Sequence, residues 1–94
     1  MNEIDEAYRS HKRYWGVAHH GRILDQLVEE SAELIQAIMK YKRREVIYDR
    51  VEEGIADVLL CIDFFLRDIQ HEQAMRDRVS ALAFKLKQEI EREP

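Results

Sequence analysis

Apolar residues recur every three or four positions along most of this chain, with polar residues between them. This spacing places the apolar side chains on one face of an α-helix. The pattern predicts four helical segments, with the approximate ranges 3–14, 22–43, 46–68 and 73–92. We therefore expect an all-α fold.

The two middle segments carry the broadest apolar faces. The repeat in 22–43 contains Leu24, Leu27, Ser31, Leu34, Ile38 and Tyr41, and the repeat in 46–68 contains Val51, Ile55, Val58, Ile62 and Leu66. Further apolar residues extend the face of 46–68 nearly all round, as expected for a helix in the middle of a bundle. The connections at 44–45 and 70–72 are short, so successive helices should be antiparallel. The chain is predicted to be a single domain, residues 1–94, folded as an antiparallel four-helix bundle.

Residues 15–21 interrupt the helical pattern. Trp15 and Gly16 end the first segment, and Gly21 marks a second irregular point. We predict that His19 and His20, which lie between these points, belong to a loop. Adjacent residues do not share a helix face, so the two histidines are not expected to form a metal-binding pair.

The composition agrees with a small helical protein. Charged residues make up 36% of the chain and hydrophobic residues 46%, with three Gly and one Pro, which is Pro94. Because helix breakers are rare and the apolar residues are periodic, we expect order rather than disorder. A chain of 94 residues buries only a marginal core, so we expect it to assemble as a homodimer or homotetramer.

Charge and cysteine content narrow the classes of function. The net charge of −4 gives no support for a nucleic-acid polymer as a partner. Cys61 lies in an apolar run, and we interpret it as a buried structural thiol. The first six residues lack the apolar core of a signal peptide, and no apolar stretch approaches the roughly 20 residues of a membrane span. We therefore expect a soluble cytoplasmic protein with no membrane partner.

Two pairs of acidic residues stand out against this background. Glu30 and Glu33 are three residues apart, and Glu53 and Asp57 are four apart, so each pair shares a helix face. One such pair in a chain with 19 acidic residues is most simply a solvated, salt-bridged surface. Two pairs on neighbouring antiparallel helices favour a metal site, because the like charges repel unless a cation lies between them. Oxygen ligands without His or Cys suit Mg²⁺ or Mn²⁺.

Both pairs lie in stretches that resemble a known family. The segment Glu29-Glu30-Ser31-Ala32-Glu33-Leu34-Ile35-Gln36-Ala37, followed by Lys40-Tyr41-Lys42-Arg43, resembles the Glu-Glu-x-x-Glu motif of the all-alpha pyrophosphohydrolase superfamily. Its amino-acid sequence is close to that of the small, phage-type MazG-like members. The segment Ile55-Ala56-Asp57-Val58, with Asp63 after it, resembles the second motif of the same family. The resemblance covers about residues 15–66 and is weak elsewhere.

The resemblance implies a magnesium-dependent nucleoside triphosphate pyrophosphohydrolase with a MazG-like fold. Such an enzyme cuts nucleoside triphosphates to monophosphate and pyrophosphate, an activity that would serve housecleaning of the nucleotide pool. Glu30, Glu33, Glu53 and Asp57 would be the metal ligands, and Glu29, Glu30 and Glu33 the catalytic residues, with Glu29 outside the first ligand shell. The family usually has Glu three residues before the second-motif Asp, where this chain has Gly54. Either Glu53 takes over as ligand or one ligand is missing.

Five further residues are candidates for contact with the nucleotide. Trp15 could stack on a base or could anchor packing, and relatives in the family often carry Trp-Gly in this region. Tyr41 faces the same choice and favours the core. Lys40, Lys42 and Lys85 could contact phosphates, although each taken alone is more simply a solvated lysine.

Two alternatives to this enzyme remain open. A bundle that has lost a metal ligand at Gly54 would bind a nucleotide or a partner protein without turnover. Phosphoribosyl-ATP pyrophosphohydrolase shares the fold of the resembled family, and the phage-type tail after the first motif argues against it.

Overall fold

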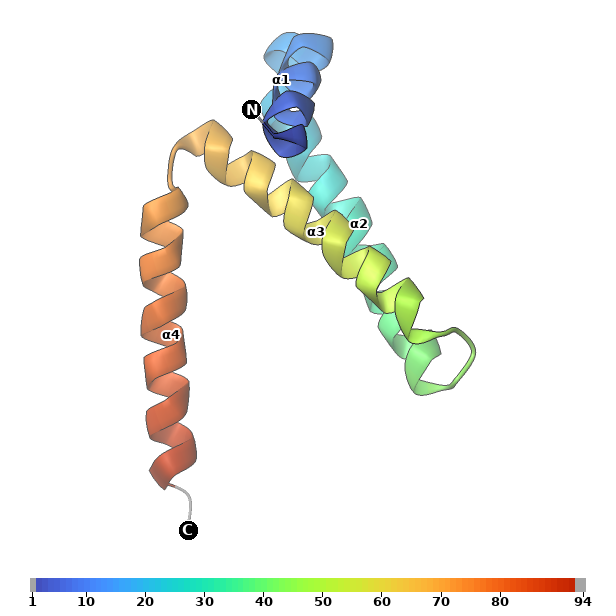
Figure 1. Ribbon diagram of the computed structural model, residues 1–94, viewed down its shortest axis with the longest axis vertical. Coiled ribbons are helices and arrows are strands. Elements are labelled where there is room, and N and C mark those ends of the chain that lie inside the picture. Colours follow the sequence, from blue (N-terminus) through green and yellow to red (C-terminus); the bar gives the residue numbers. More distant parts are fainter. Residues whose placement is uncertain (1, 93–94) are drawn as a thin grey trace.

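The computed structural model describes residues 2–92, which form four α-helices and one short 3₁₀ helix (Figure 1). In chain order they are α1 (Glu3–Trp15), η1 (Gly16–Ala18), α2 (His19–Lys42), α3 (Tyr48–Ile69) and α4 (Glu72–Arg92). The prediction of an all-α chain with four helices is confirmed for this range. The ends of the predicted domain, residue 1 and residues 93–94, lie outside the described residues.

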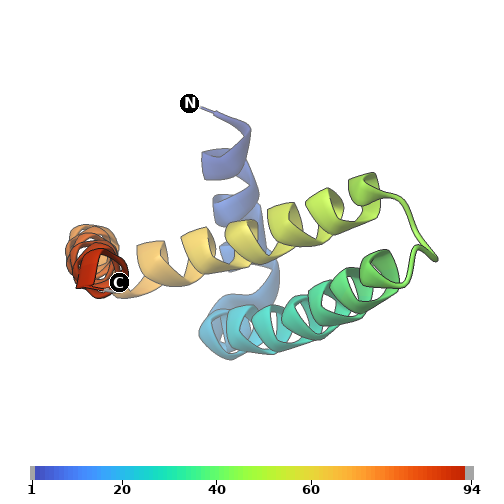
Figure 2. The ribbon, with the colours of Figure 1, turned by 90° about the horizontal axis from the view of Figure 1, so that it is seen from below.

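Helix α1 is bounded by a capping residue before its first residue and by a glycine after its last. The Asn2 side chain accepts a hydrogen bond of 2.9 Å from the backbone N–H of Asp5, as an N-cap residue does. At the other end Gly16 adopts φ 54°, in the left-handed region that glycine enters most readily. The chain turns there through η1 into α2, so α1 crosses the end of α2 (Figure 2).

The expectation that His19 and His20 lie in a loop is wrong. They are the first two residues of α2, which continues directly from η1. His19 is 4% exposed, while His20 is exposed. The sequence pattern did not reveal this start for two reasons. The 3₁₀ helix η1 leads directly into α2, and α2 has no side-chain cap that would mark its first residue.

Helices α2 and α3 form an antiparallel hairpin, as their short connection predicted (Figure 2). Gly54 of α3 packs against Leu34 of α2. A Cβ atom placed on Gly54 would be 3.1 Å from Cδ1 of Leu34 and 3.4 Å from its Cα. The absence of a side chain at position 54 therefore lets the backbone of α3 approach α2.

The buried core is small and is displaced from part of the predicted repeat. The buried apolar residues are Ile23, Ala37, Val51 and Phe64. From the repeat predicted for α2, Leu27 and Leu34 are half-buried, but Leu24, Ile38 and Tyr41 are 38–44% exposed. Apolar residues occupy two neighbouring stripes of α2, and α3 covers only one of them.

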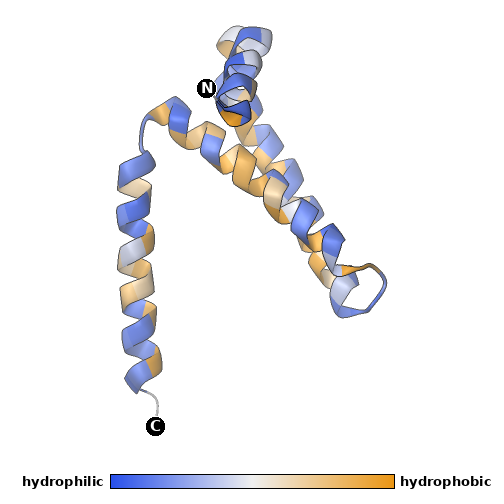
Figure 3. Ribbon diagram, viewed as in Figure 1, coloured by the Kyte–Doolittle hydropathy of each residue, from blue (hydrophilic) through white to orange (hydrophobic). Residues whose placement is uncertain are grey.

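Helix α4 does not complete a four-helix bundle within the chain. It packs beside its connection to α3 and then diverges from the hairpin (Figure 1). The radius of gyration is 16.6 Å, against about 12 Å for a compact domain of this length. The predicted apolar stripe of α4 has exposures of 56–65% and consists of Val79, Leu82, Leu86 and Ile90. Figure 3 shows these hydrophobic segments of α4 alternating with hydrophilic ones.

No helix within residues 2–92 has both the length and the apolar character that crossing a bilayer requires.

Candidate carboxylate site between α2 and α3

Glu30, Glu33 and Asp57 come together across the helical hairpin. Partial burial is the largest cause that raises the pKa of Glu30, and the charges of Glu33 and Asp57 raise it further. Hydrogen bonding between the Glu30 carboxyl and the same two groups acts in the same direction. The two acidic pairs read from the sequence therefore contribute three carboxylates to one cluster.

Local helix geometry explains why these three residues meet. Glu30 and Glu33 lie on one face of α2, on successive turns. Asp57 follows Gly54 by three residues on α3, and Gly54 packs against Leu34 of α2. The small residue at position 54 thus brings the next turn of α3, with Asp57, up to the acidic face of α2.

Glu53 lines a cleft together with Glu33 and Asp57, but it is paired with a cation. Its carboxylate is 3.6 Å from a guanidinium nitrogen of Arg50, and its side chain is 60% exposed. The groups that shift the pKa of Glu30 do not include it. Among the four predicted metal ligands, Glu53 is therefore the one with a competing cationic partner.

The cleft has a volume of about 340 Å³ and carries both signs of charge. Its lining consists of Glu33, Gln36, Ala37, Lys40, Val46, Arg50, Glu53, Gly54 and Asp57. Lys40 lies seven residues after Glu33, and Arg50 lies seven residues before Asp57. Seven residues of helix span about 10 Å, so both cations lie two turns from the carboxylates, toward the α2–α3 connection.

Arg50 was missed in the sequence. The signal that could have identified it is this matching spacing on two antiparallel helices. Two basic residues, each two turns from an acid and both toward the shared connection, must lie at the same end of the hairpin. Arg50 becomes a candidate only when its distance from Asp57 is compared with the distance of Lys40 from Glu33 on the other helix.

Most of the other nucleotide-contact candidates lie outside the cleft lining. Tyr41 packs edge-on against Tyr48, with ring centroids 5.8 Å apart. Lys42 is the last residue of α2 and is exposed, and Lys85 is exposed on α4. Of the three predicted lysines, the structure brings only Lys40 to the cleft.

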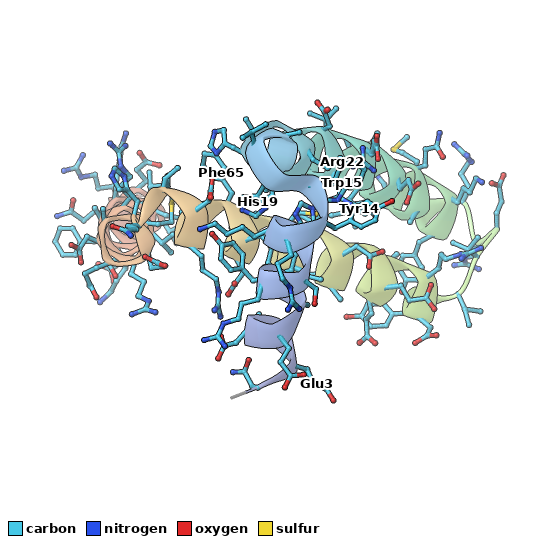
Figure 4. The ribbon with its side chains drawn as sticks, turned by 90° about the horizontal axis from the view of Figure 1, so that it is seen from above. Glu3, Tyr14, Trp15, His19, Arg22 and Phe65 are labelled. Atoms are coloured by element: carbon cyan, nitrogen blue, oxygen red, sulfur yellow. The ribbon has the colours of Figure 1, made fainter. Side chains whose placement is uncertain are left out.

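Trp15 and Glu29 both contact Arg22, which lies near the start of α2. The guanidinium carbon of Arg22 is 5.2 Å from the centroid of the Trp15 ring, and Tyr14 contacts the same ring edge-on (Figure 4). Arg22 also lies 3.5 Å from the carboxylate of Glu29. Trp15 thus takes part in packing at the α1–α2 corner, and Glu29 has a cationic partner beside the cluster.

Cys61 is half-buried near the carboxylates. Burial raises the pKa of its thiol, and the charges of Glu30 and Asp57 raise it further. A thiol held neutral in this way is a poor nucleophile. The cysteine is therefore left out of the chemistry of the site.

The residues of the cluster suit a divalent cation by donor type. Three carboxylates that repel one another are a set of oxygen donors, which Mg²⁺ and Mn²⁺ prefer. Within residues 2–92, however, no three or more His, Cys, Asp or Glu side chains are already grouped so that they could hold a metal ion. The carboxylates would therefore have to rotate toward one another to share a cation.

Comparison of the chain with models of protein families, with curated proteins and with solved structures finds no match.

Proposed function

We propose that this protein is a magnesium-dependent nucleoside triphosphate pyrophosphohydrolase of the MazG-like kind. The observation that carries the proposal is the convergence of Glu30, Glu33 and Asp57, on which the two family-like motifs fall. The crowded charge raises the pKa of Glu30, so the cluster has a physical reason to accept a cation.

Acidic and basic residues of the hairpin would have separate roles, the first in binding the cation and the second in binding phosphate. Glu30, Glu33 and Asp57 would hold the cation, with Glu53 joining them once it leaves Arg50. When bound, Mg²⁺ supplies neutralisation of phosphate charge and an activated water. Lys40 and Arg50, two turns away, would bind the outer phosphates, which places the released pyrophosphate toward the α2–α3 connection.

Homo-oligomerisation belongs to the same proposal. The exposed apolar stripe of α4 and the extended shape support assembly with further copies of the chain. Such an assembly would supply the helices that one chain lacks for a closed bundle.

The test is product analysis with matched variants. The wild-type protein, with Mg²⁺ or Mn²⁺, is incubated with canonical and modified nucleoside triphosphates and with phosphoribosyl-ATP, and the products are separated by chromatography. We expect monophosphate and pyrophosphate. Asp57→Asn should lower the rate by about 100-fold or more, because it removes one ligand of the cation that would neutralise the phosphate charge.

Glu52→Gln is the matched control, because Glu52 is exposed on α3 and lies outside the cleft lining. It should retain the wild-type rate. Diphosphate with free phosphate as products, or an unchanged rate in Asp57→Asn, would contradict the assignment.

A non-catalytic nucleotide-binding bundle is the second candidate. The Arg50–Glu53 contact favours it, because that contact leaves three clustered carboxylates instead of four. This candidate predicts thermal stabilisation by nucleotide without turnover. It also predicts that Gly54→Glu restores activity, although a side chain at position 54 must first displace Leu34.

A further inference from the structure

The apolar face of α4 is only partly covered within its own chain. This α4 stripe has spacings of four, three, four and four residues and consists of Met75, Val79, Leu82, Leu86 and Ile90. Its first two residues line an open groove of about 580 Å³ with α3 residues such as Leu59 and Ile62. The last three are 56–65% exposed, because α4 diverges from the hairpin (Figure 1). The apolar face of α4 therefore extends beyond the cover that its own α3 provides.

Helix α2 has an uncovered apolar face of the same length. This outer stripe lies opposite the buried Ala37, is 38–70% exposed and consists of Leu24, Val28, Ile35 and Met39. Both stripes extend over 15 residues, from 75 to 90 and from 24 to 39, which is about 22 Å of helix. With Ser31 as its middle residue, the outer stripe repeats the spacings of the α4 stripe in the same order. The two stripes therefore match for parallel packing, with Val79 beside Val28.

Charged residues along the edges of the two stripes have opposite signs. Arg78 and Lys85 each precede a residue of the α4 stripe, whereas Asp25 and Glu29 each follow a residue of the outer stripe. Parallel helices bring these two kinds of edge together, as in coiled coils. All four side chains are exposed, and the ion pairs among residues 2–92 include neither Arg78 nor Lys85. The basic edge of α4 thus complements the acidic edge of α2.

Two α4 helices would suit each other less well, because the other edge of the α4 stripe is also basic. Arg76 and Lys87 each follow a residue of the stripe. Antiparallel pairing of two α4 helices would place the edge with Arg78 and Lys85 against itself. Parallel pairing would place that edge against Arg76 and Lys87. Both arrangements bring like charges together, which is destabilising, so the charge pattern selects an acidic partner helix.

We propose that two copies of this chain exchange their α4 helices, so that each α4 packs in parallel along the outer stripe of the other copy's α2. The inference rests on the homo-oligomerisation in the proposed function, and it identifies the two surfaces that meet. When Val79 lies beside Val28, Arg78 is level with the helical turn that contains both acids of the α2 edge.

Charge favours the parallel direction over the antiparallel one. The apolar spacings also match in reverse when Ala32 instead of Ser31 is taken as the middle residue of the outer stripe. That arrangement would place Lys87, which already has an acidic partner, beside the acids of α2. It would also place Arg76 near Lys40. The parallel arrangement avoids this repulsion and engages Arg78 instead.

The course of the helices allows the exchange to close at two chains. Within one chain α2 and α4 both run from the end at which α1 lies toward the opposite end (Figure 1). A two-fold axis along this common direction preserves it, so each α4 can run parallel to the α2 of the other copy. Reciprocal exchange gives a closed dimer, whereas a one-way contact would continue into a filament.

Charge reversal in the full-length protein tests the contact by sedimentation equilibrium. One double variant, Arg78→Glu with Lys85→Glu, reverses the basic edge of α4. The other, Asp25→Lys with Glu29→Lys, reverses the acidic edge of α2. Each variant alone should raise the dimer dissociation constant by about tenfold or more, because like charges then face each other in both copies of the contact. An equimolar mixture should restore the wild-type constant, because every α4 then meets an α2 of opposite charge.

Lys12→Glu with Arg13→Glu is the control, because it makes the same change in net charge on α1 and should leave the dissociation constant unchanged. A mixture that stays monomeric, or an α2 variant that dimerises as the wild type does, overturns the α4–α2 contact while leaving homo-oligomerisation in place. A monomeric wild type overturns both. Product analysis of the wild type reports separately on the enzymatic part of the proposed function.

Disulfide linkage in a Cys61→Ser background tests the direction of packing. A mixture of Val28→Cys and Val79→Cys chains should form a linked dimer under mild oxidation, since parallel packing places these two positions side by side. Val28→Cys mixed with Leu86→Cys is the matched control, because only antiparallel packing would place position 86 beside position 28. Linkage of the control pair in place of the first pair overturns the parallel exchange.

Discussion

At the residue scale, the position of each carboxylate in the candidate site determines the charge that acts on its neighbours. Glu30 is half-buried, and the other two acids act on it from both helices, so its pKa is raised. A raised pKa for an acid means that the folded state binds more protons than the unfolded state. Without metal, this contribution to stability is present at low pH and is lost as pH rises through the folded-state pKa of Glu30.

Glu33→Gln should therefore stabilise the metal-free protein at neutral pH. It removes like charge from Glu30, and such helical pairs cost about 0.2–0.5 kcal/mol. With Mg²⁺ the order should reverse, since the wild type gains a bound ion that the variant holds more weakly. Thermal unfolding at pH 7.5, with and without Mg²⁺, measures both effects. Equal stabilisation of the two proteins by Mg²⁺ would show that Glu33 is not a ligand.

At the scale of elements, a glycine lies in the contact between α2 and α3. Gly54 faces Leu34, whereas Gly21 in the first turn of α2 has no atom within 4 Å of the position that a Cβ would take. Both are helical glycines. Comparing an alanine substitution at each position therefore separates the effect of packing from the effect of helix propensity. It also changes the interpretation of Gly54, because the missing side chain permits a helix contact.

Gly21→Ala should raise the free energy of unfolding by up to about 1 kcal/mol, the usual difference in helix propensity. Gly54→Ala should yield no such gain, because its Cβ would press on Leu34 at 3.1 Å. It should also weaken Mg²⁺ binding, since moving α3 away displaces Asp57. Urea unfolding and calorimetric titration measure these effects. An equal gain in both variants would mean that the two helices are free to separate.

At the scale of the whole molecule, the chain leaves too much apolar surface exposed for a closed fold. Only four apolar residues are buried within the described range. Helix α4 has no buried residue, and its first turns line an open groove with α3 that includes Leu59, Ile62, Met75 and Val79. We propose that further copies of the chain cover this surface.

Leu82→Glu combined with Leu86→Glu should therefore dissociate the proposed assembly to a monomer of about 11.3 kDa. Burying each leucine contributes roughly 2 kcal/mol, and a buried glutamate without a partner adds a further penalty. Sedimentation equilibrium measures the mass. Ala81→Glu combined with Gln88→Glu adds the same charge on the opposite face of α4 and should leave the assembly intact. A monomeric wild type would contradict the prediction.

The local pattern of the sequence was sufficient to predict the four helices. Apolar spacing, short connections and the scarcity of breakers predicted four helices and the antiparallel α2–α3 pair, because helix formation depends mainly on neighbours three and four residues away. The acidic pairs were found for the same reason. The start of α2 was missed because it depends on the turn of η1 and on the burial of His19.

Relations between helices required the tertiary structure. The face of α2 that is buried and the meeting of Asp57 with Glu30 both depend on the distance and rotation between two helices. So do the contact of His11 with His19 and the divergence of α4. The spacing of residues along one helix determines which side chains share a face, and packing against another helix determines what that face meets.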